Sequence, residues 1–211
     1  MHAFLWLSLT ALGLGTVHAD DGPFIRLPAP QTSGGKPLMQ ALKERHSTRE
    51  FSPRVLPAQL LSDLLWAASG VNRPESGKRT APSARDWREI DVYVVTADGA
   101  YVYDPDTQLL RRVLARDVRA LTGLQDFVAS APLNLVYVAN LNRMTDASPD
   151  DRDRYAAADA AFMAQNVYLY CASAGLGAVV RGLVNRAALA SALGLDGHQQ
   201  IMFAQTVGYP K

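Results

Sequence analysis

Cysteine is almost absent from this sequence, which has a single one, Cys171, in 211 residues. A chain with one cysteine cannot form an internal disulfide, so a disulfide-stapled scaffold is excluded. Cys171 stands in an apolar helical pattern, and we interpret it as a small core residue because buried free cysteine is common. The alternative interpretation is a reactive thiol.

An excess of either charge is also missing, since 21 Lys and Arg face 20 Asp and Glu for a net charge of +1. This balance gives no support for nucleic acid or an anionic membrane surface as a partner. Histidine is scarce too, and of the four only His46 and His198 lie beyond residue 19. We expect His198, near a predicted turn, to be solvated, and we predict no acid–base dyad and no metal site.

Long apolar runs are absent beyond the first nineteen residues. Residues 4–17 are almost uninterruptedly apolar, and Val17-His18-Ala19 ends on small residues at the positions that determine cleavage. This pattern predicts a signal peptide, residues 1–19, that is removed after Ala19. A membrane anchor is the alternative, but the run is shorter than the roughly 20 residues that span a bilayer. We therefore expect an exported, periplasmic protein without stable membrane insertion.

The rest of the chain has a composition typical of a globular protein, with 48% hydrophobic and 19% charged residues. Residues 20–36, rich in Pro, Gly and Ser, are expected to form an extended arm, and residues 37–211 one domain. Periodicity and caps predict helices over 37–44, 57–69, 109–121, 125–130, 150–174 and 186–193. They predict strands over 90–95, 101–103, 133–138, 177–180 and 200–207, with a long loop over 71–88. The fold class is α+β, with helices around a mostly antiparallel sheet.

The densest polar motif is Arg45-His46-Ser47-Thr48-Arg49, directly after the first predicted helix. If the backbone is extended there, Arg45, Ser47 and Arg49 point to one side, because alternate residues share a face. Two guanidinium groups and a hydroxyl on one face suit a phosphate dianion. The alternative is a solvated charged turn.

Two further segments contain residues that suit the approach of a ligand. In residues 79–84, Pro82 stiffens the backbone, and the small Ser83 and Ala84 would let a flat ligand approach closely; the alternative is a plain surface loop. Residues 175–182 contain three glycines, typical of a helix end and turns. They are not a dinucleotide fingerprint, because no strand precedes them and no helix follows directly.

Four ordered blocks of the sequence resemble the nitroreductase family. Residues 45–51 look like its N-terminal FMN signature, and residues 64–70 with 79–84 are similar to its second block. Residues 163–169 with 175–177 resemble its central helix and following strand, and Gly208-Tyr209-Pro210 resembles its closing strand. The hairpin around Tyr93 and residues 101–103 resembles most the branch that contains the azoline (thiazoline and oxazoline) oxidases.

This resemblance implies a nitroreductase-like homodimer with two FMN sites at the subunit interface. Arg45, Ser47 and Arg49 would hold the phosphate and ribityl end, with His46 also among the cofactor-binding residues. The partner subunit would supply a loop that lines the flavin ring. The last residues of the strand predicted after Gly177 would lie near the N5 and O4 atoms of the flavin. The residues concerned are Pro82, Ser83 and Ala84 for the loop, and Arg181 and Gly182 for the strand end.

The sequence departs from the family pattern at two places. The family usually has glycine after the Ser-Ala pair of the loop, where this chain has Arg85. The family also usually continues past Gly-Tyr-Pro with basic residues for the phosphate, where only Lys211 follows here. We therefore expect a phosphate site that depends more strongly on the arginines at 45 and 49.

The implied function is an FMN-dependent oxidoreductase that exchanges hydride or electrons with a small organic substrate. NAD(P)H is a candidate donor, although export would separate the protein from the cytoplasmic nicotinamide pool. Two alternatives stay open. One is a flavin-fragmenting or dehalogenating enzyme on the same fold, and the other is an exported flavin-binding module without turnover.

Overall fold

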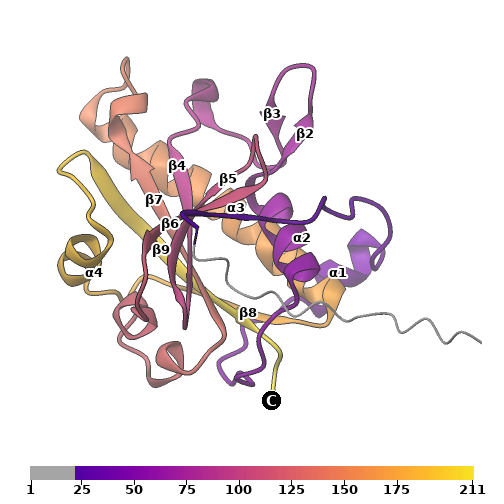
Figure 1. Ribbon diagram of the computed structural model, residues 1–211. Coiled ribbons are helices and arrows are strands. Elements are labelled where there is room, and N and C mark those ends of the chain that lie inside the picture. Colours follow the sequence, from indigo (N-terminus) through magenta and orange to yellow (C-terminus); the bar gives the residue numbers. More distant parts are fainter. Residues whose placement is uncertain (1–21) are drawn as a thin grey trace, which may run out of the picture.

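The computed structural model describes residues 22–211, and the predicted signal peptide lies outside this range. A seven-stranded sheet forms the centre of the molecule, with strand order β1-β6-β5-β4-β7-β9-β8 (Figure 1). All of its paired strands are antiparallel. The strands are β1 (Phe24–Arg26), β4 (Ile90–Thr96), β5 (Gly99–Asp104), β6 (Leu109–Leu114), β7 (Leu133–Asn140), β8 (Gly177–Arg181) and β9 (Gln199–Gly208).

Four α-helices flank the sheet: α1 (Leu38–Glu44), α2 (Ala58–Ser69), α3 (Pro149–Ala174) and α4 (Arg186–Leu193). The helix α3 is the longest element, and α1 and α2 pack against it (Figure 1). Its limits follow from local chemistry, because the Ser148 side chain accepts the Asp151 N–H at the start. At its end Gly175 has φ 71°, a left-handed conformation that costs glycine little. Among residues 22–211, no helix is both long and apolar enough to cross a bilayer.

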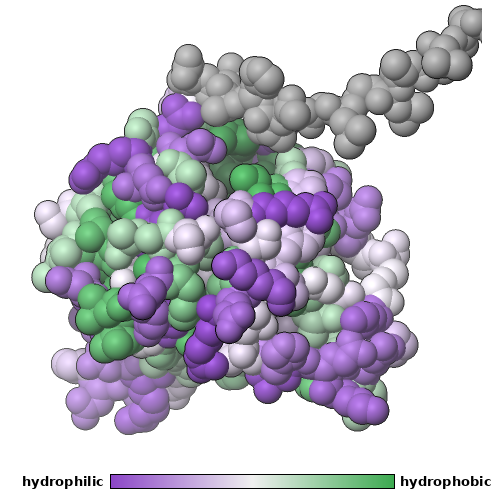
Figure 2. Space-filling model, turned by 90° about the horizontal axis from the view of Figure 1, so that it is seen from below, coloured by the Kyte–Doolittle hydropathy of each residue, from purple (hydrophilic) through white to green (hydrophobic). Residues whose placement is uncertain are grey.

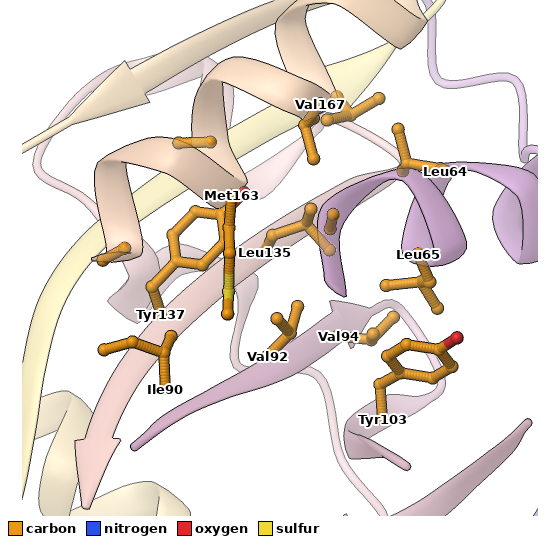
Figure 3. Close-up of a cluster of buried hydrophobic side chains, with 14 of the residues drawn as sticks. Leu64, Leu65, Ile90, Val92, Val94, Tyr103, Leu135, Tyr137, Met163 and Val167 are labelled. Atoms are coloured by element: carbon orange, nitrogen blue, oxygen red, sulfur yellow. The ribbon is translucent and has the colours of Figure 1, made fainter. Parts of the chain in front are cut away.

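Both faces of the central strands are covered, which explains their nearly continuous apolar sequences. Val92 and Val94 of β4 pack with Leu135 and Tyr137 of β7 against α2 and α3 (Figure 3). The alternate residues Tyr93, Val136 and Val138 pack on the other side of the sheet against α4. The mostly antiparallel α+β fold predicted from the sequence is confirmed.

The helix predicted over residues 109–121 is wrong. Residues 109–114 form β6, which pairs with β5 and β1, and only Arg119–Thr122 form a short 3-10 helix. In the strand, Leu110 is buried and Arg111 is exposed, an alternation of period two. Pairing with two neighbours therefore outweighs the helix-like spacing of the leucines.

Two further segments differ in detail from the predictions. The long loop over 71–88 contains a small hairpin, β2 (Val71–Arg73) with β3 (Lys78–Arg79), and a 3-10 turn, Ala84–Asp86. Residues 125–130 contain only a 3-10 turn, Asp126–Ala129, rather than an α-helix. Cys171 is buried, as predicted, and burial raises the pKa of its thiol, so this group is a core residue.

Candidate functional site

Residues 45–49 lie along β8, at the edge of the sheet. Ser47 forms a parallel bridge with Ala178, and the Thr48 N–H donates to the Ala178 carbonyl oxygen at 2.9 Å. Arg45 caps α1 with an extended backbone, φ −57° and ψ 120°. The segment is therefore extended, the geometry that the alternating motif requires.

Tyr168 of α3 contacts two of the predicted residues, Arg45 and Ser47. The Arg45 guanidinium lies 5.4 Å from the centre of its ring, and the Ser47 Oγ lies 3.1 Å from its hydroxyl. The same hydroxyl accepts the Val180 N–H of β8 at 2.8 Å. Arg45 and Ser47 thus share one face of the extended segment, and we call Arg45, Ser47 and Arg49 the clamp.

The other members of the motif are more open. Arg49 and His46 are exposed, and the His46 Nδ1 lies 2.8 Å from the Glu44 carbonyl oxygen. Within residues 22–211, neither Arg45 nor Arg49 forms an ion pair with a carboxylate. The clamp therefore presents two cations without an internal counter-ion, together with a hydroxyl, on an open surface. This donor set fits a phosphate or another multiply charged oxyanion.

Gly177 allows the clamp segment to approach β8. A Cβ on Gly177 would lie 2.8 Å from the Thr48 Cβ and Cγ2, closer than side chains pack in proteins. The glycines at 175 and 177 therefore have different tasks: the first ends α3, and the second makes room for Thr48.

The end of β8 places its two predicted residues differently. Ala178 and Val180 face α3, so Arg181 points to the opposite side of the sheet. Its guanidinium donates to the Thr122 carbonyl oxygen at 2.6 Å and to the Asn134 Oδ1 at 2.9 Å. Arg181 is 4% exposed, and burial lowers its pKa to about 10. Its side chain is engaged in the interior, whereas Gly182 is exposed.

The loop Pro82–Ala84 lies elsewhere along α3. The Ala84 N–H donates to the Asp159 Oδ2 at 2.9 Å, and the Ser83 Oγ donates to the Glu89 Oε2 at 3.3 Å. Tyr168 lies nine residues beyond Asp159, about 14 Å further along the helix axis. Within one chain, the clamp and the loop therefore do not meet.

The residue after Ala84 shows what replaces the expected glycine. Arg85 has φ 49° and ψ 19°, the left-handed conformation that favours glycine. Asp86 and Arg88 also have positive φ angles, 57° and 50°. The backbone thus keeps a glycine-like turn despite three side chains that strain it.

The sequence motifs do not indicate three residues that contact the predicted site residues in the structure: Tyr168, Glu89 and Asp159. Tyr168 lies in the block 163–169, and a tyrosine in an apolar helix could have indicated a buried ring with a polar contact. Glu89 and Asp159 are separated by 70 positions, and nothing in their spacing indicates that they meet. No metal-binding cluster of His, Cys, Asp or Glu occurs among residues 22–211.

Apolar residues are exposed on the outer sides of α1 and α3. Leu38, Met39 and Leu42 of α1 are exposed, Met39 to 75%, as is Phe162 of α3. Seen from below, hydrophobic and hydrophilic residues alternate over the surface (Figure 2). A cavity of about 570 Å³ between β1, α2 and the β4–β5 hairpin involves neither clamp nor loop residues.

Comparison with known proteins shows which family the chain resembles in sequence and structure. The model of the Nitroreductase family matches residues 42–209. A nitroreductase-like protein of Methanocaldococcus jannaschii is 37% identical over 155 residues, which cover 69% of this chain and 78% of that protein. The crystal structure of a nitroreductase-like protein from Ralstonia eutropha JMP134 is 50% identical, with TM-score 0.87 and coverage of 90% of both chains.

A more distant solved structure is an NADPH:FMN oxidoreductase from Vibrio harveyi complexed with NAD+. It is 22% identical, with TM-score 0.61, and the match covers 82% of this chain and 69% of that one. At this identity the similarity shows the fold alone.

Proposed function

Because this chain belongs to the nitroreductase family, we propose that it is an FMN-dependent oxidoreductase that exchanges hydride or electrons with a small organic substrate. The observation that carries the proposal is the clamp, in which Arg45 and Ser47 share one face of the segment along β8. The relationship to oxidoreductases of this fold supports the redox part, and the charge of the clamp supports FMN rather than riboflavin.

The clamp residues would hold the phosphate and ribityl end of FMN. Arginine forks match phosphate oxygens in pairs, and the Ser47 hydroxyl adds a neutral hydrogen bond. Tyr168 would position the clamp, since its hydroxyl links Ser47 to the backbone of β8. Gly182 would offer close backbone approach to the ring, whereas the Arg181 side chain would act from within the sheet by fixing the strand end. When bound, FMN supplies the hydride chemistry at its ring.

We also propose that the active form is a homodimer. The clamp and the loop lie about 14 Å apart along α3 and share no contact in one chain, and the family pattern takes the loop from a second chain. The exposed apolar side chains of α1 and α3 support such contact, because large apolar patches on a monomer mark interfaces. Light scattering of the flavin-loaded protein should give twice the mass of the chain, and a monomer mass would contradict the two-chain site.

The clamp is tested by flavin titration. Charged hydrogen bonds contribute about 1.5–3 kcal/mol each, so Arg45→Ala and Arg49→Ala should each weaken FMN binding about tenfold or more. Riboflavin, which lacks the phosphate, should bind the wild type correspondingly more weakly than FMN. Arg116→Ala, at an exposed arginine outside the clamp, is the matched control. Equal FMN affinity in all four proteins would show that the clamp is a solvated turn.

The reaction class and the donor are tested on the loaded protein. Bleaching of the flavin absorbance by NAD(P)H supports nicotinamide as donor, and bleaching by an azoline-containing peptide supports the azoline-oxidase branch. Bleaching by dithionite alone favours the alternative of a flavin-binding module without turnover. Enzymatic turnover of a halogenated substrate, or loss of the flavin ring itself, favours the dehalogenating or flavin-fragmenting alternative.

We propose in addition that the protein is exported to the periplasm, from the apolar run that ends at Ala19. Mass spectrometry of the protein from its native cells should show Asp20 as the first residue. An intact Met1 on the cytoplasmic protein would contradict export.

A further inference from the structure

Two buried carboxyl groups hold neighbouring residues of the loop Pro82–Ala84. Glu89, which directly precedes β4, is 0% exposed, and Asp159 of α3 is 2% exposed. Each accepts a hydrogen bond from the loop: Glu89 from the Ser83 hydroxyl, and Asp159 from the Ala84 N–H. Ser83 in turn accepts the Arg88 N–H at 2.8 Å. The pair therefore binds the loop through both a side chain and the backbone.

Among residues 22–211, no cationic side chain forms an ion pair with Glu89 or Asp159. Three arginines near the loop pair with other carboxylates. Arg85 pairs with Asp146, Arg88 with Asp86, and Arg79 with Asp106. Two adjacent buried carboxylates without a counter-ion cannot both be ionised.

One oxygen of the pair has no partner. The Glu89 Oε1 is buried and forms no hydrogen bond with the described groups. A proton shared with Asp159 would supply this oxygen with a hydrogen-bond partner. Consistently, burial first and then the charge of Asp159 raise the pKa of Glu89 to about 7.

The loop needs such an anchor because the following turn is strained. Arg85, Asp86 and Arg88 all have positive φ angles, which each cost a non-glycine residue on the order of 1 kcal/mol. Local preferences would relax this turn and shift the loop. The acid pair binds Ser83 and Ala84, which precede the turn. Glu89, a member of the pair, directly follows the turn, so both ends of the turn are fixed.

We propose that Glu89 and Asp159 share one proton and thereby hold Ser83 and Ala84 in the position from which this loop closes the flavin site of the partner subunit. Glu89 is then a positioning residue that acts through Ser83. The inference rests on the proposed function, because only a flavin at the two-chain site makes the position of the loop functionally important. Loss of the shared proton makes the carboxylates repel each other and loosens the loop.

The first experiment compares FMN binding at pH 6.5 and pH 8.5. In Glu89→Gln the amide donates to Asp159 and accepts from Ser83, so it imitates the protonated acid at every pH. We expect the variant to match the wild type at pH 6.5 and to bind FMN on the order of tenfold more tightly than the wild type at pH 8.5, the effect of about one pKa unit of interaction. Glu75→Gln, at an exposed glutamate of the β2–β3 turn, should follow the wild type at both pH values.

A second variant, at the other carboxyl group, tests whether the result depends on the shared proton rather than on the substitution at Glu89 alone. Asp159→Asn can donate to Glu89 and still accept the Ala84 N–H, so it should show the same pH-independent affinity. Glu89→Ala removes the anchor and should bind FMN weakly at both pH values. Equal pH dependence of the wild type, Glu89→Gln and Asp159→Asn would overturn the proposal.

Hydrogen exchange of the flavin-free protein tests the acid pair separately. Peptides that cover residues 80–90 should exchange faster in the wild type than in Glu89→Gln at pH 8.5, and equally at pH 6.5. If neither the wild type nor any variant binds FMN but this difference in exchange appears, the result supports the shared proton and contradicts the proposed function. If the wild type binds FMN and the exchange rates are equal at both pH values, the proposed function stands and the acid pair falls.

Discussion

Gly177→Ala should detach the clamp from the sheet. The new Cβ would lie 2.8 Å from the Thr48 Cβ and Cγ2 and 2.9 Å from its Oγ1. Overpacking of this kind costs about 1–3 kcal/mol, whereas the hydrogen bond from Thr48 to Ala178 contributes about 1 kcal/mol. The segment should therefore leave β8 rather than absorb the clash, and Arg45 and Ser47 should lose their common position at Tyr168.

The expected result is a large loss of FMN affinity with a small loss of stability. Losing one charged hydrogen bond weakens FMN binding about tenfold to a hundredfold, while detachment limits the change in unfolding free energy to about 1 kcal/mol. Fluorescence titration and urea denaturation measure the two quantities. Gly197→Ala is the matched control, because a Cβ there meets nothing within 4 Å. Wild-type affinity in Gly177→Ala, or no recovery when Thr48→Gly is added, would refute the reasoning.

Three further changes test other parts of the structure. Tyr168→Phe leaves the Val180 N–H without its acceptor, so thermal melts should show a loss of about 1–2 kcal/mol and titrations a weaker FMN complex. Arg85→Gly relieves a φ of 49° and should raise the unfolding free energy by about 1 kcal/mol in urea, since its exposed ion pair contributes little; a decrease would show that the turn is not strained. The pKa of Glu89 is about 7 in the folded protein and about 4.3 in the unfolded chain. The unfolding free energy of the wild type should therefore fall as the pH rises from about 4.5 to about 7, and that of Glu89→Gln should change less. Parallel pH curves for the two proteins would contradict the raised pKa.

Much of the fold follows from local patterns. The caps and periodicity locate α1, α2, α3 and α4 to within a few residues, because each helix has an apolar face and recognisable ends. The apolar run of residues 133–138 predicts β7, whose two faces are both buried. The prediction fails over residues 109–121, where leucine spacing imitates a helix and pairing with β1 and β5 decides the structure.

The candidate site is less predictable because its parts meet only in the fold. The alternation in residues 45–49 predicts a shared face, and two of its members, Arg45 and Ser47, both contact Tyr168 from the extended segment. The direction of Arg181 depends on which face of β8 meets α3, and a short strand with both faces buried carries no such signal. Glu89 stands at a strand entry and Asp159 in a helix 70 positions later, so only tertiary structure brings both carboxyls to the adjacent loop residues Ser83 and Ala84.

The helix α3 contacts both halves of the proposed site. Asp159 anchors the loop, and Tyr168 anchors the clamp about 14 Å further along the same helix. In a twofold dimer each patch meets its counterpart reciprocally, so one protomer would give its clamp to one site and its loop to the other. A rigid helix then fixes the distance between the two sites as well as the position of each half. For this reason the loop needs a firm anchor on α3: a loop that moved independently of the helix would vary the width of the partner's site while leaving the clamp intact.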